Sequence, residues 1–360
     1  MTPLKVLVVG VGQMGLSHAL GYAAIDGWNI AGMVVRDPAR RQVIVERFPA
    51  VAIYDEFDRA LAETERDAVS INTYPDTHAR FAIASIEAGA HVFVEKPLAS
   101  TVEDAVRVVE AARRGNRKLV VGYILNHHPS WKKFVELTKS LGRPLVMRMN
   151  LLQQSSGQAW NIHKKMLSAG LQPIVDCGIH YVEIMCQMTG SRPIRVNAMS
   201  ARLSAEVQTP NYGQLQLEFA DGSRGWYEAA YGPSISETAF FVKDVLGPFG
   251  SVSIVNKPAV EHAKKDVSTS ADINSHTLAN YLLVHHAQLN GDGGFAKADE
   301  WIKVEDEPGH DELCRREQEF FLEAIRNDID LTDHMETAIE SLRIVLAADK
   351  SSRIRESVEI

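Results

Sequence analysis

The sequence predicts an α/β protein with two domains. A doubly wound parallel sheet is expected over residues 1–123, followed over 124–360 by an α+β domain with a large, mostly antiparallel open sheet. Three observations predict this arrangement. The length of 360 residues suits two domains better than one. Short apolar runs alternate with helix-like stretches in the first third, and several strand-like stretches then follow one another without intervening helices.

The first domain is predicted from five apolar segments that lack polar alternation, as expected for strands covered by helices on both faces. Strands are expected at 4–10, 30–35, 68–72, 91–94 and 119–121, with helices at 13–26, 38–48, 76–88 and 101–114. Strand–helix–strand units at this spacing form right-handed crossovers, so the sheet is expected to be parallel.

The second domain is expected where this rhythm changes, after Tyr123. Helices are expected at 129–140 and 173–189, and the dipeptide Asp221-Gly222 indicates a hairpin. Strands are expected at 145–154, 193–203, 213–220, 223–231 and 238–245, and closing helices at 310–328 and 334–352. The polar stretch 257–280 has no clear period and is interpreted as a long loop.

Charge and cysteine content narrow the function classes. The formal net charge is -8 and no long basic run occurs, so neither a nucleic acid nor an anionic membrane is expected as a partner. The odd set Cys177, Cys186 and Cys314 contains no CxxC pair and indicates a reducing, cytoplasmic setting. The apolar run 4–10 is too short to span a membrane and lacks the basic leader of a secretion signal.

A glycine motif follows the first expected strand. Gly10, Gly12 and Gly15 form the pattern GxGxxG, with Gln13 and Met14 between the last two glycines, and the motif opens a helix. The first glycine permits a tight turn, the second lets the backbone approach a pyrophosphate, and the third lets helix and strand pack closely. The helix N-terminus then offers N–H groups to the phosphates. In this context the motif predicts a dinucleotide site.

The choice of dinucleotide depends on the next strand end. About 20 residues beyond such a motif, an acidic side chain usually binds the adenosine ribose. Val35 stands there instead, Arg36 follows at once, and Arg40 and Arg41 lie one turn later. Arginine pairs with a 2′-phosphate, so NADP is favoured over NAD. NAD stays open, because Asp37 could still reach the ribose.

Two further clusters carry chemistry. Glu95-Lys96-Pro97 follows the strand 91–94, at the sheet edge where ligands of open α/β sheets bind. Asp176 and His180 are four residues apart on an expected helix and should project from one face. A carboxylate beside an imidazole can move a proton near neutral pH, although a capping Asp and a core His would show the same spacing.

Together with the motif NTYPDTH at 72–78, these motifs resemble the glucose–fructose oxidoreductase/inositol dehydrogenase (Gfo/Idh/MocA) family over nearly the whole chain. The resemblance implies a Rossmann domain followed by a domain whose open sheet serves oligomerisation. It implies catalytic roles for Lys96, Asp176 and His180. Cofactor contacts are implied for the loop 73–75. Adding the neighbouring motif residues, the expected contacts are Asn72, Thr73, Tyr74, Pro75, His78, Glu95 and Lys96.

Candidate pocket residues combine hydrogen-bonding groups with a flat apolar ring, which suits a sugar, although an ordinary polar loop remains the alternative. They are Tyr123, Asn126, His127, Gln154, Ser155, Ser156, Trp160 and His163, in addition to Lys96, Asp176 and His180. No metal site is expected, because the adjacent histidines at 127–128 and 285–286 point apart and no cysteine or carboxylate spacing completes a set.

These features predict reversible hydride transfer between a nicotinamide cofactor and a secondary alcohol of a sugar, inositol or related polyol. His180 is expected to act as general base, Lys96 to stabilise the same oxygen, and Asp176 to orient the substrate or the imidazole. Two alternatives stay open: an NAD-dependent glycosidase that oxidises transiently, and a catalytically silent dinucleotide-sensing protein. The individual substrate cannot be named from fold and motif.

A homodimer or homotetramer is expected from one alternating strand. Leu215, Leu217 and Phe219 should pack on helices, which leaves the opposite face to water or a partner. That opposite face carries Gln214, Gln216 and Glu218, and the segment 224–228 adds Trp226 and Tyr227. Large aromatics are enriched at interfaces, so this sheet face is the predicted subunit contact.

Overall fold

The computed structural model describes residues 2–236, 242–255 and 281–360. The chain forms two compact units, each described by itself below. Unit 1 consists of Met1–His127 and Pro308–Leu342, and unit 2 of His128–Glu307 and Arg343–Ile360. The segment 308–342 thus groups with unit 1 although it lies far along the chain, and the expected domain boundary after residue 123 stays a prediction.

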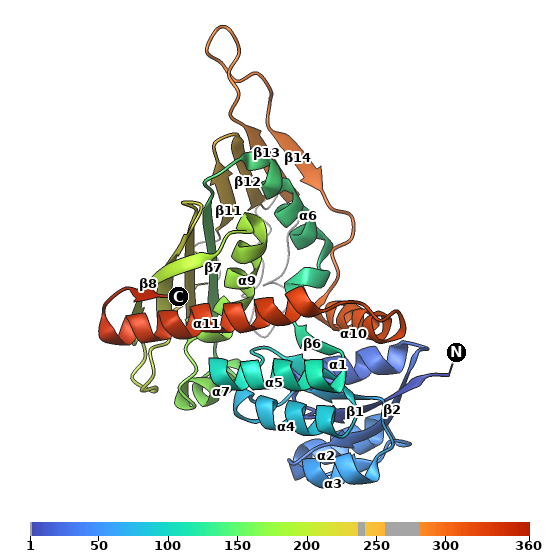
Figure 1. The fold of residues 1–360 in the computed structure, drawn as a ribbon. Coiled ribbons are helices and arrows are strands. Elements are labelled where there is room, and N and C mark those ends of the chain that lie inside the picture. Colours follow the sequence, from blue (N-terminus) through green and yellow to red (C-terminus); the bar gives the residue numbers. More distant parts are fainter. Residues whose placement is uncertain (1, 237–241, 256–280) are drawn as a thin grey trace. The chain divides into compact units, whose positions relative to one another are not determined.

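Unit 1 contains a six-stranded parallel sheet in the order β3-β2-β1-β4-β5-β6 (Figure 1). Its strands are β1 Leu4–Val9, β2 Trp28–Val34, β3 Ile53–Tyr54, β4 Ala68–Ile71, β5 His91–Glu95 and β6 Leu119–Gly122. Its helices are α1 Gln13–Ala24, α2 Pro38–Arg47, α3 Phe57–Glu63, α4 Pro75–Glu87 and α5 Val102–Gly115, followed by the 3-10 turn η1 Ile124–His127. The expected doubly wound parallel sheet is thus confirmed.

Within the described part of this unit, the sequence prediction did not include β3, α3 or the short turn η1. β3 has two residues and α3 has seven, too few to give a readable period. The central strands are fully buried: Val6, Leu7 and Val8 of β1 and Val69 of β4 expose none of their surface. Their unbroken apolar sequence therefore reflects helices on both faces of the sheet.

Helix α10 (His310–Arg326) completes the core of unit 1 although it lies far along the chain. Phe321 of α10 stacks on Trp28 with ring centroids 5.5 Å apart, and the Trp28 indole N–H donates to the Gln318 carbonyl at 3.1 Å. Gly21 of α1 lets the two helices approach, since a Cβ there would lie 3.1 Å from the Arg315 Cα. This packing explains why the segment 308–342 belongs to the first unit.

Unit 2 contains, within the described residues, a nine-stranded sheet in the order β14-β13-β12-β11-β7-β10-β9-β8-β15 (Figure 1). The strands are β7 Val146–Gln154, β8 Pro193–Ala201, β9 Tyr212–Phe219, β10 Arg224–Gly232, β11 Lys243–Gly247, β12 Gly250–Val255, β13 Tyr281–His286, β14 Glu300–Lys303 and β15 Val358–Glu359. All pairs are antiparallel except β10 with β7. The expected large, mostly antiparallel sheet is confirmed.

The helices of unit 2 cover one face of this sheet. They are α6 Pro129–Thr138 with η2 Lys139–Leu141, α7 Gly157–Ser168, α8 Pro173–Asp176, α9 Gly178–Thr189 and the second part of α11, which runs over Thr332–Ile354. Glycines permit close packing of α9 on β10: a Cβ on Gly178 would lie 3.2 Å from the Tyr227 ring, and one on Gly225 would lie 2.6 Å from the Met185 sulfur.

Three expectations for unit 2 need correction or comment. The helix expected at 173–189 is divided into α8 and α9 at Cys177. The sequence prediction did not include α7 or the strands β12 to β15, several of which are short or follow the long polar stretch. The expected loop at 257–280 and part of the strand expected at 238–245 lie outside the described residues.

Among the residues that the structure describes, no helix has the length and apolar character needed to cross a membrane.

Candidate functional site

The glycine turn between β1 and α1 has the geometry that its sequence predicts. Gly10 has a φ of +82°, and a Cβ there would lie 2.8 Å from the Asn72 carbonyl oxygen and from Thr73 Cγ2. A Cβ on Gly15 would lie 1.9 Å from the Gly10 carbonyl oxygen. Around Gly12, by contrast, nothing lies within 4 Å of the position of a Cβ. Gly10 and Gly15 therefore allow the turn to pack, and Gly12 leaves open space beside the helix start.

The start of α1 fits the pyrophosphate of a dinucleotide. Gln13 and Met14 begin the helix directly after Gly12, and its first turn contains no acidic residue. The initial N–H groups of a helix attract anions, and no carboxylate of this turn competes for them. Arg40 holds the loop in place, because its Nε donates to the Val11 carbonyl at 2.9 Å. These residues would hold the diphosphate when the cofactor binds.

The ribose end of this site lies after β2. Arg36 is exposed there, whereas Arg41 donates to the Val35 carbonyl at 3.2 Å. Asp37 caps α2 by accepting the Ala39 N–H at 3.0 Å. Of the predicted phosphate-binding arginines, Arg36 is thus the most accessible. The carboxylate of Asp37 has a structural task, which leaves its second oxygen for any ribose contact.

The loop after β4 is held against the loop after β5 by one histidine. His78 is fully buried, and its ring nitrogens lie 2.7 Å from the Pro97 carbonyl oxygen and 3.0 Å from the Thr73 carbonyl oxygen. Burial lowers the pKa of His78, although both carbonyls oppose this effect. A neutral imidazole donates to only one of them, and the shorter contact is with Pro97. His78 therefore positions both expected cofactor loops, including exposed Tyr74.

Glu95 ends β5 and anchors the motif that contains Lys96. Its Oε1 lies 2.6 Å from His18 Nε2, and its Oε2 accepts the backbone N–H of Lys96 at 3.2 Å. The other nitrogen of His18 faces the Gln318 amide at 2.8 Å. Lys96 itself is half-buried, followed by buried Pro97. This network ties α1, β5 and α10 together directly behind the expected catalytic lysine.

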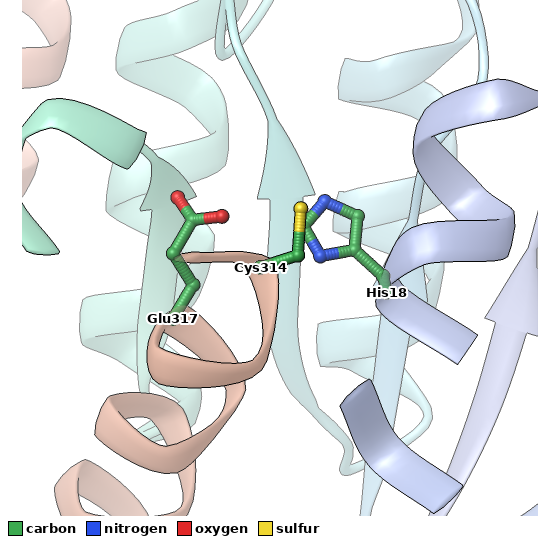
Figure 2. A group of neighbouring side chains, drawn as sticks. All are labelled: His18, Cys314 and Glu317. Carbon is green, nitrogen blue, oxygen red and sulfur yellow. The ribbon is translucent and has the colours of Figure 1, made fainter. Parts of the chain in front are cut away.

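Beside this network lies a cluster of three residue types that can bind metals, shown in Figure 2. His18 comes from α1, and Cys314 and Glu317 come from α10; one ligand atom of each lies within 4.8 Å of the others. Both nitrogens of His18, however, already face Glu95 and Gln318. Burial raises the pKa of the Cys314 thiol and of the Glu317 carboxyl, so both favour their protonated forms. We interpret the cluster as part of the packing between α1 and α10.

In unit 2, Asp176 lies at the end of the short helix α8 and is 7% exposed. The Tyr231 hydroxyl of β10 donates to its Oδ2 at 2.7 Å. Cys177 Sγ lies 2.8 Å from the same hydroxyl. Burial, and then the charge of Asp176, raise the pKa of the Tyr231 phenol, which keeps it a donor. His180 is half-buried in the first turn of α9, where its N–H donates to the Cys177 carbonyl at 3.2 Å.

The remaining pocket candidates of unit 2 divide into buried and accessible groups. Trp160 is buried beside Leu167, Val207 and Tyr231, and its indole N–H donates to Glu206 at 3.1 Å. Its ring is therefore a packing element of this cluster. Among the others, His163 and Gln154 are half-buried, Ser155 is buried and Ser156 is exposed. The His163 ring stacks on Tyr231 with centroids 4.1 Å apart, and burial lowers its pKa.

The three candidates of unit 1 after β6 have separate surroundings. Tyr123 is buried and its hydroxyl lies 2.7 Å from the Ser341 hydroxyl. Asn126 and His127 are half-buried in η1. The His127 ring lies 5.4 Å from that of Phe320, so it packs against α10.

The sequence models of one protein family match both parts of the chain. The Rossmann part, described as "Oxidoreductase family, NAD-binding Rossmann fold", matches residues 4–123, and the C-terminal domain of the same Gfo/Idh/MocA family matches residues 133–237. Together they cover more than half of the chain. The chain belongs to the Gfo/Idh/MocA oxidoreductase family.

Individual relatives agree with this membership. Inositol 2-dehydrogenase 2 of Saccharopolyspora erythraea is 26% identical over 70% of this chain and 73% of its own. D-glucoside 3-dehydrogenase of Escherichia coli is 21% identical over 80% of this chain and 88% of its own. The solved structure of an Agrobacterium radiobacter oxidoreductase with NAD+, L-tartaric acid and magnesium shares the fold at a TM-score of 0.78, with 15% identity and coverage of 99% and 98%.

In this Gfo/Idh/MocA oxidoreductase, several residues of the site were missed from the sequence. His18 stands three residues after Gly15, one turn into the helix, which was a readable signal because that position faces the sheet. Gln318 had no signal, since it reaches His18 across 300 residues. Tyr231 appeared only as one residue of an expected strand. The described structure brings His18 against Glu95 and Tyr231 against Asp176, whereas Gln318 contacts His18.

Proposed function

We propose that the protein transfers hydride between a nicotinamide cofactor and a secondary alcohol of a sugar, inositol or related polyol. The observation that carries this proposal is Lys96, half-buried at the C-terminal end of β5, in the same sheet whose glycine turn fits a dinucleotide. Ligands of open α/β sheets bind at this edge. Relatives named inositol 2-dehydrogenase and D-glucoside 3-dehydrogenase support a polyol or sugar substrate.

The nicotinamide ring supplies the chemistry of hydride acceptance and donation when the cofactor is bound. In the direction of oxidation, His180 accepts the proton of the substrate hydroxyl as general base. Lys96 donates a hydrogen bond to the same oxygen and stabilises its developing charge. Asp176 orients the substrate or the imidazole, and Tyr231 keeps its carboxylate hydrogen-bonded. Asn126, His127, Gln154 and His163 are the candidates for further substrate hydroxyls.

A substrate panel tests the proposal. Inositols, free sugars, glucosides and nucleotide sugars are incubated with NAD and with NADP, and formation of the reduced nicotinamide is followed by its near-ultraviolet absorbance. We expect turnover with at least one polyol or sugar. Conversion of a glycoside without net reduction, by protein that retains its cofactor through gel filtration, would favour the glycosidase alternative. Tight cofactor binding without turnover of any compound would favour the dinucleotide sensor.

We further propose that NADP binds more tightly than NAD. Exposed Arg36 is placed for a 2′-phosphate, while Asp37 caps α2. The Arg36→Ala substitution should reduce the difference in binding free energy between NADP and NAD by about 1.5–3 kcal/mol, the usual contribution of a hydrogen bond to a charged group. Calorimetric titration of both cofactors against wild type and variant measures this. Tighter binding of NAD by the wild type would contradict the proposal and assign the ribose to Asp37.

A homodimer or homotetramer is proposed from the uncovered face of the nine-stranded sheet. Leu215, Leu217 and Phe219 are buried, as the alternation predicts, and Gln216 is exposed on the other face. Of the two aromatics expected at this subunit contact, Tyr227 is instead buried inside, and half-buried Trp226 is on the open face, opposite Gln216. Static light scattering at micromolar protein tests this proposal. A mass near the monomer's 39.8 kDa would contradict it.

A cytoplasmic location is proposed from the cysteines. Cys177, Cys186 and Cys314 are all free thiols, as expected in a reducing compartment. Cell fractionation that recovered the protein outside the cytoplasm would contradict this.

A further inference from the structure

The surroundings of the Tyr231 hydroxyl connect it to the acid expected to work in the reaction. Tyr231 is fully buried, and its hydroxyl donates to Asp176 Oδ2 at 2.7 Å. The same oxygen lies 2.8 Å from Cys177 Sγ, so the thiol can donate to the phenol while the phenol donates to the carboxylate. A neutral hydroxyl that donates to a carboxylate stabilises the ionised form of the acid and fixes its rotamer.

Tyr231 is held by a stacked ring and by its backbone pairing in the sheet. His163 of α7 stacks on it at 4.1 Å with an interplanar angle of 12°. In the sheet, Tyr231 pairs with Gln153 of β7, and its N–H donates to the Asn211 carbonyl at 2.9 Å. The hydroxyl is thus fixed at the end of a rigid strand, whereas Asp176 belongs to a helix of four residues. A short helix has little rigidity of its own, so strand β10, through the Tyr231 hydroxyl, fixes the position of the Asp176 carboxylate.

We propose that Tyr231 is the positioning residue for Asp176: its hydroxyl holds the carboxylate ionised and in one orientation for the reaction. This inference rests on the proposed function, because Asp176 is given a role there. Titratable groups that face Asp176 and Tyr231 include Cys177 at the junction of α8 and α9, His163 on α7 and Tyr227 on β10. In this proposal Tyr231 acts through Asp176 and does not itself contact the substrate.

The chain offers a matched control on the same strand. Tyr227 is also fully buried, and its ring stacks on Tyr181 at 4.6 Å. Its hydroxyl has no hydrogen-bond partner among the described residues. Tyr227→Phe and Tyr231→Phe therefore remove the same atom from the same strand at the same burial, and only the second removes a donor from Asp176.

The first readout does not require a known substrate. The infrared carboxyl band of Asp176, obtained as the difference between wild type and Asp176→Asn, is followed over pH to measure the pKa of this acid. We expect Tyr231→Phe to raise that pKa by about one unit or more, because the ionised form loses its donor, and Tyr227→Phe to leave it in place. An unchanged pKa in Tyr231→Phe would overturn the inference, whatever the activity.

The second readout is the pH profile of kcat and KM with myo-inositol, or with a better substrate from the panel. Tyr231→Phe should lower kcat on the order of ten-fold and move the acidic limb to higher pH, while Tyr227→Phe matches wild type. A purely structural role would lower the melting temperature without moving the limb, and would overturn the inference. Wild-type turnover by Asp176→Asn would instead refute the role of Asp176 and thus the proposed mechanism.

A third variant covers the case in which Tyr231→Phe does not fold. Replacement of Tyr231 by 3-fluorotyrosine keeps the ring and hydroxyl but makes the phenol a stronger donor. The pKa of Asp176 should then fall, and the acidic limb should move to lower pH. A fluorinated protein that titrates like wild type would overturn the inference.

Discussion

Two buried acids, one in each unit, have opposite surroundings. Asp176 is 7% exposed and accepts a hydrogen bond from the Tyr231 hydroxyl at 2.7 Å. Glu317 is 1% exposed, and neither of its carboxyl oxygens has a hydrogen-bond partner among the described residues. Burial raises the pKa of Glu317 well above its ordinary value, and the charge of Glu95 raises it further. Similar burial thus accompanies two different chemical environments.

The difference shows what equips a buried acid for chemistry. A carboxylate taken out of water loses solvation and picks up a proton unless donors replace the water. Tyr231 provides such a donor for Asp176, whereas Glu317 is left to become neutral. Asp176, which has a role in the proposed reaction, therefore has a hydrogen-bond donor that stabilises its ionised form. Glu317 is explained by packing alone. Replacing each acid by its amide separates the two cases.

The largest effect is expected for Asp176→Asn. The amide keeps the shape but removes the negative charge that orients the substrate or the imidazole, so kcat should fall on the order of 10³-fold. Stability and cofactor affinity should change little, because the amide oxygen still accepts from Tyr231 and the glycine turn is untouched. Steady-state kinetics, melting temperature and cofactor titration measure these effects. Turnover close to wild type would remove the distinction between the two acids.

The next largest effect is expected for Lys96→Ala, which should lower kcat on the order of 10²-fold or more. The reason is its place after β5, with its backbone N–H held by Glu95. Cofactor affinity should stay largely intact, because the glycine turn and α1 are the proposed source of the diphosphate contacts. Lys132→Ala, at an exposed position of α6, is the control for loss of a lysine. Wild-type turnover by the Lys96 variant would exclude this residue from the mechanism.

The parts of the site predicted from the sequence depend on local rules. Gly10 was predictable because the turn needs a positive φ there, and Gly15 because a Cβ would lie 1.9 Å from the Gly10 carbonyl oxygen. The place of Lys96 at a strand end was predictable because the short apolar run before it indicates a strand of a parallel sheet, while its role in the reaction stays a prediction. Five of the six strands of the first sheet were predicted for the same reason: each is a short, unbroken apolar run.

The rest depends on contacts between distant segments. Tyr231 meets Asp176 only because β10 pairs in one register with β7 and lies beside α8, and the sequence does not specify that register. Likewise, α10 returns to unit 1 because Phe321 stacks on Trp28, a contact across nearly the whole chain. The amphipathic sequence of α10 predicts a helix with a buried face, but not which core buries it.

Linkage gives the sign of the smallest predicted effect, at Glu317. Between its ordinary pKa of 4.5 and its higher pKa in the folded state, the folded protein retains a proton that the unfolded chain releases. The free energy of unfolding therefore falls as pH rises above about 4.5. Below that pH, Glu317 is protonated in both the folded and the unfolded chain, and its burial causes no pH-dependent loss of stability. Glutamine resembles the neutral acid but does not ionise, so Glu317→Gln removes this loss.

We therefore expect Glu317→Gln to gain stability relative to wild type as pH rises, by on the order of 1 kcal/mol between about pH 5.5 and pH 8. Urea unfolding at several pH values measures it, and kcat should stay near wild type. Glu323→Gln makes the same exchange at an exposed position of α10 and is the matched control. If the unfolding curves of Glu317→Gln and wild type shifted in parallel over this range, Glu317 would be ionised in the folded protein. An unseen donor or cation would then have to hold it, and the contrast with Asp176 would fail.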